Sequence, residues 1–325
     1  MSRPKVVLTD PINPDAHALL ASHADIVVLP DGVPGEAAWR EAMTGAQGLI
    51  VRRQLPDDLF DRTVDLRAVV RHGVGLDFIP VARASARQIP VANTPAVNAN
   101  SVAEYVFAAM LGMSRQLASF DQQVRSGNWQ ARRNAGGQTF ELRGRTIGVI
   151  GYGAIGKRIG EIATNGFSMK VAAHTSTPSR LPAHVQALSL TELFAASDFI
   201  VVACPLTPQT RGMIDRHLLA QAKPGAVLIN VGRGPVIREV DLVSALNDGS
   251  INGAVLDVFE VQPLPAESGL RNHPRVMLTP HLAGMTQDAE RAMGMMAVDT
   301  VLALIRGERP DNIVNKEIYS QQMET

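Results

Sequence analysis

The stretch TIGVIGYGAIG, residues 146–156, decides the fold of this chain. An apolar run of strand length leads into a glycine-rich turn, and a helix-compatible segment follows at 157–165. In a G-x-G-x-x-G turn, the first glycine makes the tight bend, the second lets the backbone approach a pyrophosphate, and the third lets helix and strand pack closely. Free N–H groups at the start of the helix favour the anion. The turn therefore predicts a dinucleotide site at Gly151, Gly153, Ala154, Ile155 and Gly156.

The segment after the next predicted strand bears on the choice of dinucleotide. An NAD site normally has an Asp or Glu there, bonded to the ribose hydroxyls. Residues 171–177 read VAAHTST and contain no carboxylate. Thr175 and Ser176 offer hydroxyls, and Arg180 follows. We therefore favour NADP(H), with NAD(H) as the alternative if Arg180 is an ordinary solvated charge.

The glycine-rich turn lies inside a longer alternation of short apolar runs and helix-compatible segments. The runs are typical of strands in parallel sheets that are covered on both faces. We predict an α/β protein with two doubly wound parallel-sheet domains. In the first series the expected strands are 6–8, 26–29, 48–51 and 68–70, and the expected helices are 14–22, 35–44 and 56–62. In the second series the expected strands are 147–150, 170–173, 199–203, 226–230, 254–256 and 276–278.

Three further segments complete this outline. Residues 98–120 are apolar nearly all round, which indicates a helix buried on most sides, either crossing between domains or forming a subunit interface. Residues 121–145 are polar and rich in Arg and Gly, and we predict a loop. Residues 286–306 have a helical pattern that ends before Gly307.

Composition narrows the classes of function. The 325 residues include 31 basic and 31 acidic side chains, so no surplus of positive charge supports binding to nucleic acid or to a membrane surface. The length suggests two domains. One cysteine forms no internal disulfide and no cysteine-based metal site, and we expect no metal. With no signal-peptide pattern and no apolar stretch of about 18 residues, we expect a cytoplasmic protein.

Three motifs follow predicted strands of the second series: NVGRGPV at 230–236, LDVFEVQP at 256–263 and LTPHLAG at 278–284. Two more lie upstream, RHGVGLD at 71–77 and NTP at 93–95 with SVAE at 101–104. Together with GYGAIG, this series resembles the D-isomer-specific 2-hydroxyacid dehydrogenase family over nearly the whole chain. It is most similar to the branch of phosphoglycerate dehydrogenases and hydroxypyruvate/glyoxylate reductases.

The resemblance implies a domain arrangement and a reaction. A Rossmann cofactor domain, 99–286, would be inserted into a flavodoxin-like substrate domain made of 1–98 plus 287–325. The reaction would be hydride transfer between NAD(P) and C2 of a small 2-oxo or 2-hydroxy acid, D-specific, and the assembly a homodimer.

The resemblance also implies a role for individual residues. Arg233 would bind the substrate carboxylate and polarise the C2 carbonyl, work suited to a guanidinium fork. His281 would exchange a proton with the C2 oxygen, because imidazole titrates near neutral pH. Val74 and Gly75 would bind the carboxylate through backbone N–H groups. Without the family pattern, each of these residues suits a structural role as well.

On the cofactor side, Asp257 would contact the nicotinamide carboxamide. Cys204 falls in the loop on the adenosine side, although an inert buried thiol explains it equally well. The other residues implied to touch the cofactor are Thr175, Ser176, Val231, Gly232, Arg233, His281, Ala283 and Gly284.

One position departs from the family pattern. Gln262 occupies the place of the catalytic glutamate before Pro263, so an amide replaces the charge that would stabilise a neighbouring imidazolium. Three interpretations stay open. First, the enzyme retains 2-oxo acid reduction, with Gln262 orienting His281 and with the loss of activity at rising pH setting in at a lower pH than usual. Second, Glu260 substitutes for the missing carboxylate. Third, the chemistry is altered or lost. We favour the first, because Arg233 and His281 are both present.

Two rival functions follow from the same departure. Gln before Pro also occurs in formate dehydrogenases, which oxidise their substrate without proton transfer to it. A non-catalytic NAD(P)H-binding regulatory protein is the second rival, since a fold does not establish an activity.

Substrate identity is the least determined property. Several arginines and one tryptophan could border the substrate, although most loop arginines are simply solvated. These residues are Arg52, Arg53, Arg71, Arg132, Arg133 and Trp129.

Overall fold

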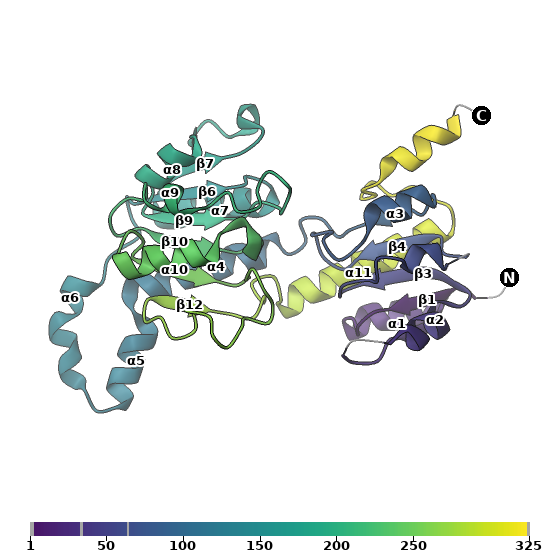
Figure 1. Ribbon diagram of the computed structural model, residues 1–325, viewed down its shortest axis with the longest axis horizontal. Coiled ribbons are helices and arrows are strands. Elements are labelled where there is room, and N and C mark those ends of the chain that lie inside the picture. The colour runs from purple at the N-terminus through teal and green to yellow at the C-terminus, as the bar shows by residue number, and fades with distance from the viewer. Residues whose placement is uncertain (1–2, 33–34, 64, 324–325) are drawn as a thin grey trace. The chain divides into compact units, whose positions relative to one another are not determined.

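A computed structural model describes residues 3–32, 35–63 and 65–323 of the chain (Figure 1). The chain forms two compact units. Unit 1 combines the segment up to Asn98 with the segment from Met285 onward, and unit 2 is the intervening Ala99–Gly284. The predicted boundaries, 98/99 and 286/287, lie at or within two residues of these divisions. Among the described residues, no helix combines the length and the apolar character needed to span a membrane.

Within the described residues, unit 1 is built on a five-stranded parallel sheet with the order β2-β1-β3-β4-β5. This is the flavodoxin-like order, as predicted. The strands are β1 (Lys5–Leu8), β2 (Asp25–Val28), β3 (Ala46–Val51), β4 (Ala68–Arg71) and β5 (Val91–Ala92). The helices are α1 (Pro14–His23), α2 (Glu36–Met43), α3 (Val81–Ala86) and α11 (Gln287–Ile305), with 3-10 turns η1 (Leu59–Asp61) and η5 (Lys316–Met323).

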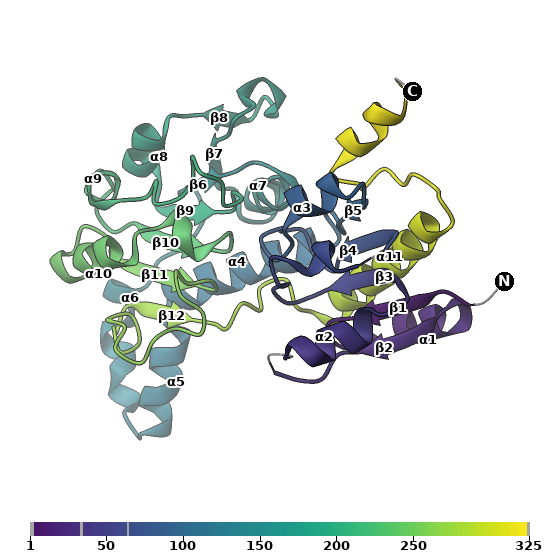
Figure 2. The same cartoon turned by 45° about the vertical axis from the view of Figure 1, so that its right-hand side comes forward.

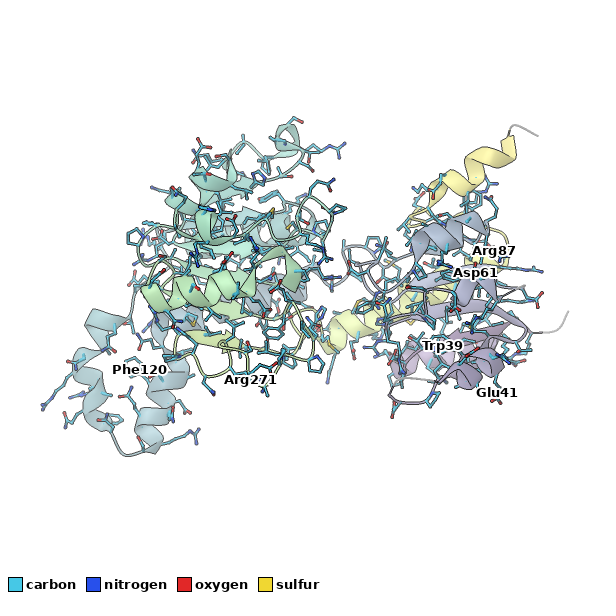
Figure 3. The ribbon with its side chains drawn as sticks, viewed as in Figure 1. Trp39, Glu41, Asp61, Arg87, Phe120 and Arg271 are labelled. Carbon is cyan, nitrogen blue, oxygen red and sulfur yellow. The ribbon has the colours of Figure 1, made fainter. Side chains whose placement is uncertain are left out.

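Alternating strand residues of unit 1 supply two separate cores. Val6 and Leu8 pack with α1 and α11, whereas Val7 packs with α2, η1 and α3 on the other face. Figure 2 shows these helices on the two faces of the sheet. On the second face Asp61 of η1 pairs with Arg83 and Arg87 of α3, and Figure 3 shows Asp61 and Arg87 side by side. Both faces are therefore covered, which explains the continuous apolar strands.

Unit 2 is built on a seven-stranded parallel sheet, counted over the described residues, with the order β12-β11-β10-β9-β6-β7-β8. Read from β8, this is the Rossmann order 3-2-1-4-5-6 with one strand added. The strands are β6 (Thr146–Ile150), β7 (Lys170–His174), β8 (Val185–Ala187), β9 (Phe199–Val202), β10 (Val227–Asn230), β11 (Gly253–Leu256) and β12 (Val276–Leu278). The helices are α4 (Ala99–Arg115), α5 (Leu117–Arg125), α6 (Ala135–Gln138), α7 (Ala154–Phe167), α8 (Leu190–Ala196), α9 (Arg216–Leu219) and α10 (Glu239–Asp248), with 3-10 turns η2 (Trp129–Asn134), η3 (Pro178–Arg180) and η4 (Gly234–Val236).

The helices of unit 2 also cover both faces of their sheet. α4 and α7 share one core with Ile147 and Val149, and α8 to α10 share the other with Ile200 and Val202. α4 buries Val102, Val106 and Met110, among others, so the prediction of a largely buried helix is confirmed.

The prediction of a loop over 121–145 is wrong. α4 ends at Arg115, the next residue, Gln116, has a left-handed φ of 49°, and α5, η2 and α6 follow as helical turns. In Figure 1 this arm extends away from the seven-stranded sheet. No residue of α5 is buried, so the arm lacks the apolar pattern that reveals a core-facing helix.

Candidate active site

Three loops of unit 2 meet at one edge of its sheet. Asn230 of β10 pairs with Leu256 of β11, which pairs with Leu278 of β12, all in parallel register. The loops that follow these strand ends carry Arg233, Gln262 and His281. The pairing therefore brings the three predicted catalytic residues to the carboxyl edge of one sheet, where α/β proteins bind their ligands.

The His281 loop has an unusual backbone. His281 has a φ of 57°, a left-handed conformation that a residue with a Cβ rarely adopts. Its N–H donates to the carbonyl of Asp257 at 2.8 Å. The side chain of Asp257 then accepts from the next two N–H groups, with Oδ1 2.8 Å from Leu282 N and Oδ2 2.9 Å from Ala283 N. Asp257 thus clamps the loop in this conformation.

A half-buried chain of two hydroxyl groups completes the Asp257 clamp. Thr279 Oγ1 donates to Asp257 Oδ1 at 2.6 Å, and Tyr105 of α4 lies 2.6 Å from Thr279 Oγ1. Because the Thr279 proton is directed to the carboxylate, the Tyr105 hydroxyl is the donor to Thr279. Burial raises the pKa of Tyr105, which keeps this hydroxyl protonated. Thr279 lies within the LTPHLAG motif, but the motif does not reveal its contact with Tyr105; the signal for Tyr105 in the sequence is a hydroxyl within an apolar helix.

The clamp bears on the predicted cofactor role of Asp257. The residue is 1% exposed, and its carboxylate accepts three protein hydrogen bonds. A carboxylate offers about four acceptor positions, so one stays for an amide donor such as a carboxamide. Asp257 therefore fits that role while holding the loop.

Gln262 lies against the imidazole of His281. Its Oε1 is 3.4 Å from His281 Nδ1, and both side chains are exposed. An amide oxygen there accepts the Nδ1 proton, which leaves Nε2 as the nitrogen that exchanges protons elsewhere. The amide thus fixes the ring orientation without adding charge.

Glu260 does not take the place of the missing carboxylate. Its Oε2 accepts from the backbone N–H of Glu239 at 3.1 Å, at the start of α10. Burial, together with the nearby Glu260, raises the pKa of Glu239. Glu260 is therefore bound to α10, and the hypothesis that it substitutes for Gln262 is not supported.

Arg233 sits in a loop whose backbone is fixed by Asn230. The Asn230 side chain donates to Arg233 O at 3.1 Å and accepts from Gly232 N at 3.0 Å. Gly234 packs against the backbone of Phe259, where a Cβ would lie 1.9 Å from a carbonyl carbon. The Arg233 and Gln262 loops are thus packed backbone to backbone, and the half-buried Arg233 guanidinium donates to Gly232 O at 2.8 Å.

The glycine-rich turn fits a dinucleotide. Gly151 has a φ of 91°, and a Cβ on Gly156 would lie 2.3 Å from Gly151 O, so the helix packs closely on the turn. A Cβ on Gly153 would meet no atom within 4 Å. Backbone access is therefore open at the start of α7, where Ala154 and Ile155 present N–H groups and no acidic residue occurs in the first turn.

Cys204 is part of the packing around this turn. A Cβ on Gly151 would lie 2.7 Å from Cys204 Cα, and one on Gly232 2.8 Å from Cys204 O. The residue is 7% exposed, and burial raises the pKa of its thiol to about 11. The structure therefore gives Cys204 a packing role beside Val231 and Gly232, which are also buried.

Beyond β7, Thr175 is half-buried and Ser176 is exposed, with Arg180 exposed at the end of η3. The segment begins beside the glycine-rich turn, because Gly151 N donates to His174 O at 2.8 Å. Hydroxyls and a cation thus follow the second strand of the sheet where other sites have a carboxylate.

The predicted carboxylate-binding residues belong to unit 1. Val74 is exposed and Gly75 half-buried, in the loop after β4. Two of the arginines considered for the substrate pair with acidic residues of unit 1: Arg52 with Glu290 at 2.9 Å and Arg53 with Asp10 at 2.6 Å. Burial opposes ionisation of Asp10, but hydrogen bonds from Arg53 and Thr9 lower its pKa overall. Arg132, Arg133 and Trp129 lie on the arm of unit 2.

Comparisons with known proteins identify relatives of this chain. The family model for the NAD-binding domain of D-isomer-specific 2-hydroxyacid dehydrogenases matches residues 107–283. A glyoxylate/hydroxypyruvate reductase B of Yersinia pestis bv. Antiqua (strain Nepal516) is 35% identical over 328 residues, covering 97% of this chain and 98% of the relative.

Two solved structures show the same architecture. A protein of Thermus thermophilus has a TM-score of 0.88 and 31% identity, covering 95% of this chain and 99% of its own. The NADPH-dependent glyoxylate/hydroxypyruvate reductase of Sinorhizobium meliloti, solved with NADP and malonate, has a TM-score of 0.83 and 33% identity, covering 96% and 97%. The chain belongs to the D-isomer-specific 2-hydroxyacid dehydrogenase family, in its reductase branch, and is an NAD(P)-dependent oxidoreductase acting at C2 of small 2-oxo and 2-hydroxy acids.

Proposed function

We propose that this protein reduces glyoxylate and hydroxypyruvate with NADPH, with Arg233, Gln262 and His281 as its catalytic residues. The observation that carries the proposal is the 3.4 Å approach of Gln262 Oε1 to His281 Nδ1, at the sheet edge that also receives Arg233. The relatives named for these two substrates supply the substrate class.

Each residue then has a defined task. Bound NADPH supplies the hydride that C2 receives. The Arg233 guanidinium binds the carboxylate and stabilises negative charge developing on the C2 oxygen. His281 donates a proton to that oxygen from Nε2, while Gln262 holds Nδ1 and so fixes the ring. The hydride and the proton together convert the carbonyl to the hydroxyl of the 2-hydroxy acid.

The remaining predicted contacts keep their assignments as proposals. Backbone N–H groups of Val74 and Gly75 bind the substrate carboxylate, so unit 1 is the substrate domain and unit 2 the cofactor domain. The cofactor is held by Gly151, Gly153, Ala154, Ile155, Gly156, Thr175, Ser176, Cys204, Val231, Gly232, Arg233, Asp257, His281, Ala283 and Gly284. Of these, Cys204 acts by supporting Gly151.

The preference for NADPH rests on the segment after β7. Residues 174–180 contain no carboxylate to repel a 2′-phosphate, and the Ser176 hydroxyl and Arg180 guanidinium are exposed there. Thr175, half-buried at the strand end, offers a second hydroxyl.

We also propose that the protein is a cytoplasmic homodimer. Its arm exposes three large apolar side chains: Leu117 is 58% exposed, Val124 54% and Trp129 63%. Leu117 and Val124 are seven residues apart in α5 and so share one helix face. A second copy of the chain would cover this face.

Initial-rate measurements test the proposed reaction. Glyoxylate and hydroxypyruvate are assayed with NADPH and NADH, and formate is assayed with NADP⁺ and NAD⁺. We expect both 2-oxo acids to be reduced, with a higher kcat/KM for NADPH. Oxidation of formate without reduction of either acid would overturn the proposal.

Two variants test the assigned roles. His281→Ala should lower kcat by about 10²-fold or more, a much larger effect than the accompanying loss of affinity for NADPH, measured by fluorescence titration. His184→Gln alters an exposed histidine and is the matched control. Wild-type turnover by His281→Ala would contradict the mechanism.

A further inference from the structure

The loop after β4 has a complete set of hydrogen bonds to its carbonyl groups. Arg71 donates from Nη1 to His72 O at 3.0 Å and from Nε to Gly75 O at 3.1 Å. Thr94 N donates to Gly73 O at 3.0 Å, and Asn93 Nδ2 donates to Val74 O at 2.9 Å. Every carbonyl from residue 72 to residue 75 thus has a donor.

Of the N–H groups of the same loop, only the first two have an acceptor among the described residues. His72 N donates to Val51 O at 2.9 Å, and Gly73 N donates to Thr94 Oγ1 at 2.9 Å. For the next two N–H groups, those of Val74 and Gly75, the part of the chain that the structure describes provides no acceptor. The loop therefore leaves two consecutive donors for an external anion.

Peptide geometry explains the direction of these two donors. In a trans peptide, the N–H points opposite to the preceding C=O. Since Gly73 O faces Thr94, the Val74 N–H points away from Thr94. Since Val74 O faces Asn93, the Gly75 N–H points away from Asn93. The donors to the carbonyls thereby set where the amides point.

Arg71 fixes the loop at both ends, through His72 O at its start and Gly75 O at its end. Its Nη1 also donates to Val51 O at 2.8 Å, which ties the loop to the end of β3. Its guanidinium carbon lies 4.7 Å from the ring centroid of Phe78, which restricts the side chain further. A planar fork reaches three carbonyls in fixed directions, which a lysine ammonium does not reproduce.

We propose that Arg71, with Asn93, is a positioning residue for the substrate carboxylate. By holding the carbonyls of residues 72–75, the two side chains keep the N–H groups of Val74 and Gly75 available to bind it. Arg71 contributes through the backbone, and its charge is not the carboxylate ligand. The inference rests on the proposed function, which assigns the carboxylate to those two N–H groups.

The test separates binding of the carboxylate from the other steps. Arg71→Met removes the three hydrogen bonds that Arg71 donates and keeps an unbranched side chain, and Asn93→Ala removes the uncharged donor to Val74 O. For Arg71→Met we expect the KM for glyoxylate and the dissociation constant of oxalate, an unreactive carboxylate, to rise in parallel by about tenfold or more. The kcat should fall less than threefold and the Kd for NADPH should stay within twofold. Asn93→Ala should give the same pattern with a smaller amplitude.

Controls make the outcome decisive. Arg67→Met removes an exposed arginine just before the other end of β4 and should leave both constants unchanged. Unchanged oxalate binding in folded Arg71→Met would overturn the inference. A large loss in Arg71→Met with none in Asn93→Ala would also overturn it, because the guanidinium charge itself would then bind the carboxylate. Oxalate titration by calorimetry requires no turnover, so a wild-type enzyme that binds oxalate but reduces no 2-oxo acid would refute the proposed function and leave this inference standing.

Discussion

Gln262 orients the His281 ring but supplies no negative charge to it. Its amide lies beside His281 Nδ1, where it holds the ring but adds no electrostatic stabilisation of the imidazolium. The proton needed for reduction is therefore retained only by the imidazole itself. A carboxylate in the same place would supply both effects.

Gln262→Glu should extend reduction to higher pH. The rate of reduction falls where His281 loses its proton, and a neighbouring carboxylate favours the protonated ring. We expect the descending limb of kcat/KM for glyoxylate to move upward by about one pH unit. The pH–rate profile checks this, with Glu260→Gln as control because Glu260 is bound to α10. A limb at the wild-type pH in a folded Gln262→Glu enzyme would contradict this account of the pair.

His72 couples the stability of the protein to pH. The ring is 5% exposed and its Nε2 has no partner among the described residues. Burial lowers the pKa of His72 to about 4 from 6.5, and the charges of Arg52 and Arg71 act in the same direction. Between pH 4 and pH 6.5, His72 is therefore protonated in the unfolded chain and neutral in the folded protein.

The sign of this effect is a loss of stability on acidification. The His72 contribution to the free energy of unfolding is full above pH 6.5 and decreases as the pH falls toward 4, by about 3 kcal/mol in all. Replacing His72 with Gln should remove this part of the pH dependence, measured by urea unfolding at pH 7.5, 5.5 and 4.5. His184→Gln provides the exposed control. Parallel curves for wild type and His72→Gln would show that His72 is protonated at the same pH in both states.

At the scale of the element, different glycines of the glycine-rich turn serve stability and cofactor binding. A Cβ on Gly156 would lie 2.3 Å from Gly151 O, whereas one on Gly153 would meet nothing within 4 Å. Gly156→Ala should therefore destabilise the protein by about 2 kcal/mol. Gly153→Ala should melt within about 2 °C of wild type, yet bind NADPH at least tenfold more weakly, because the methyl group occupies the approach to the α7 N-terminus.

Thermal melts and NADPH titrations on the two variants form a matched pair. Each changes one hydrogen for a methyl group within the same turn. Equal melting temperatures for the two would contradict the packing argument, and unaltered NADPH affinity in Gly153→Ala would contradict the assignment of the anion site.

The elements that the sequence predicts well are those with a buried face. The long strands carry continuous apolar runs because helices cover both faces of the sheet, and α4 is apolar because most of it is buried in the core that it shares with α7 and the sheet. β5 and β8 have two and three residues, too few to show a pattern. α5 buries none of its residues and depends on local contacts such as Arg125–Asp121 at 2.8 Å, so its composition is typical of a loop.

The candidate site also has parts that the sequence predicts and parts that it does not. Motifs that follow strands place Arg233, Gln262 and His281 at one sheet edge, because parallel strands end together. The Asp257 clamp was not predictable, since its donors are two backbone N–H groups and a hydroxyl from another strand end. The hydrogen bonds of Arg71 to three carbonyls likewise depend on loop conformation and not on residue type.

At the scale of the whole molecule, substitutions on the arm of unit 2 test the proposed homodimer. Val124→Glu, or Leu117→Glu, places a charge on the exposed apolar face of α5 and should shift the sedimenting species from dimer toward monomer. Val240 is 71% exposed on α10, so Val240→Glu is a matched control that should sediment as wild type. Dimers with both α5 variants would show that another surface joins the subunits.

Unit 1 is made of two chain segments that unit 2 separates, and this affects the order in which the units fold during synthesis. Its core on the α1 side requires Ala297, Val301 and Ile313 to pack on Val6 and Leu8 of the first strand. A ribosome delivers those residues last, after the whole of unit 2 has emerged. We therefore expect unit 2 to acquire its structure first during synthesis, while one face of the first sheet stays only partly covered, by α1, until α11 has been synthesised.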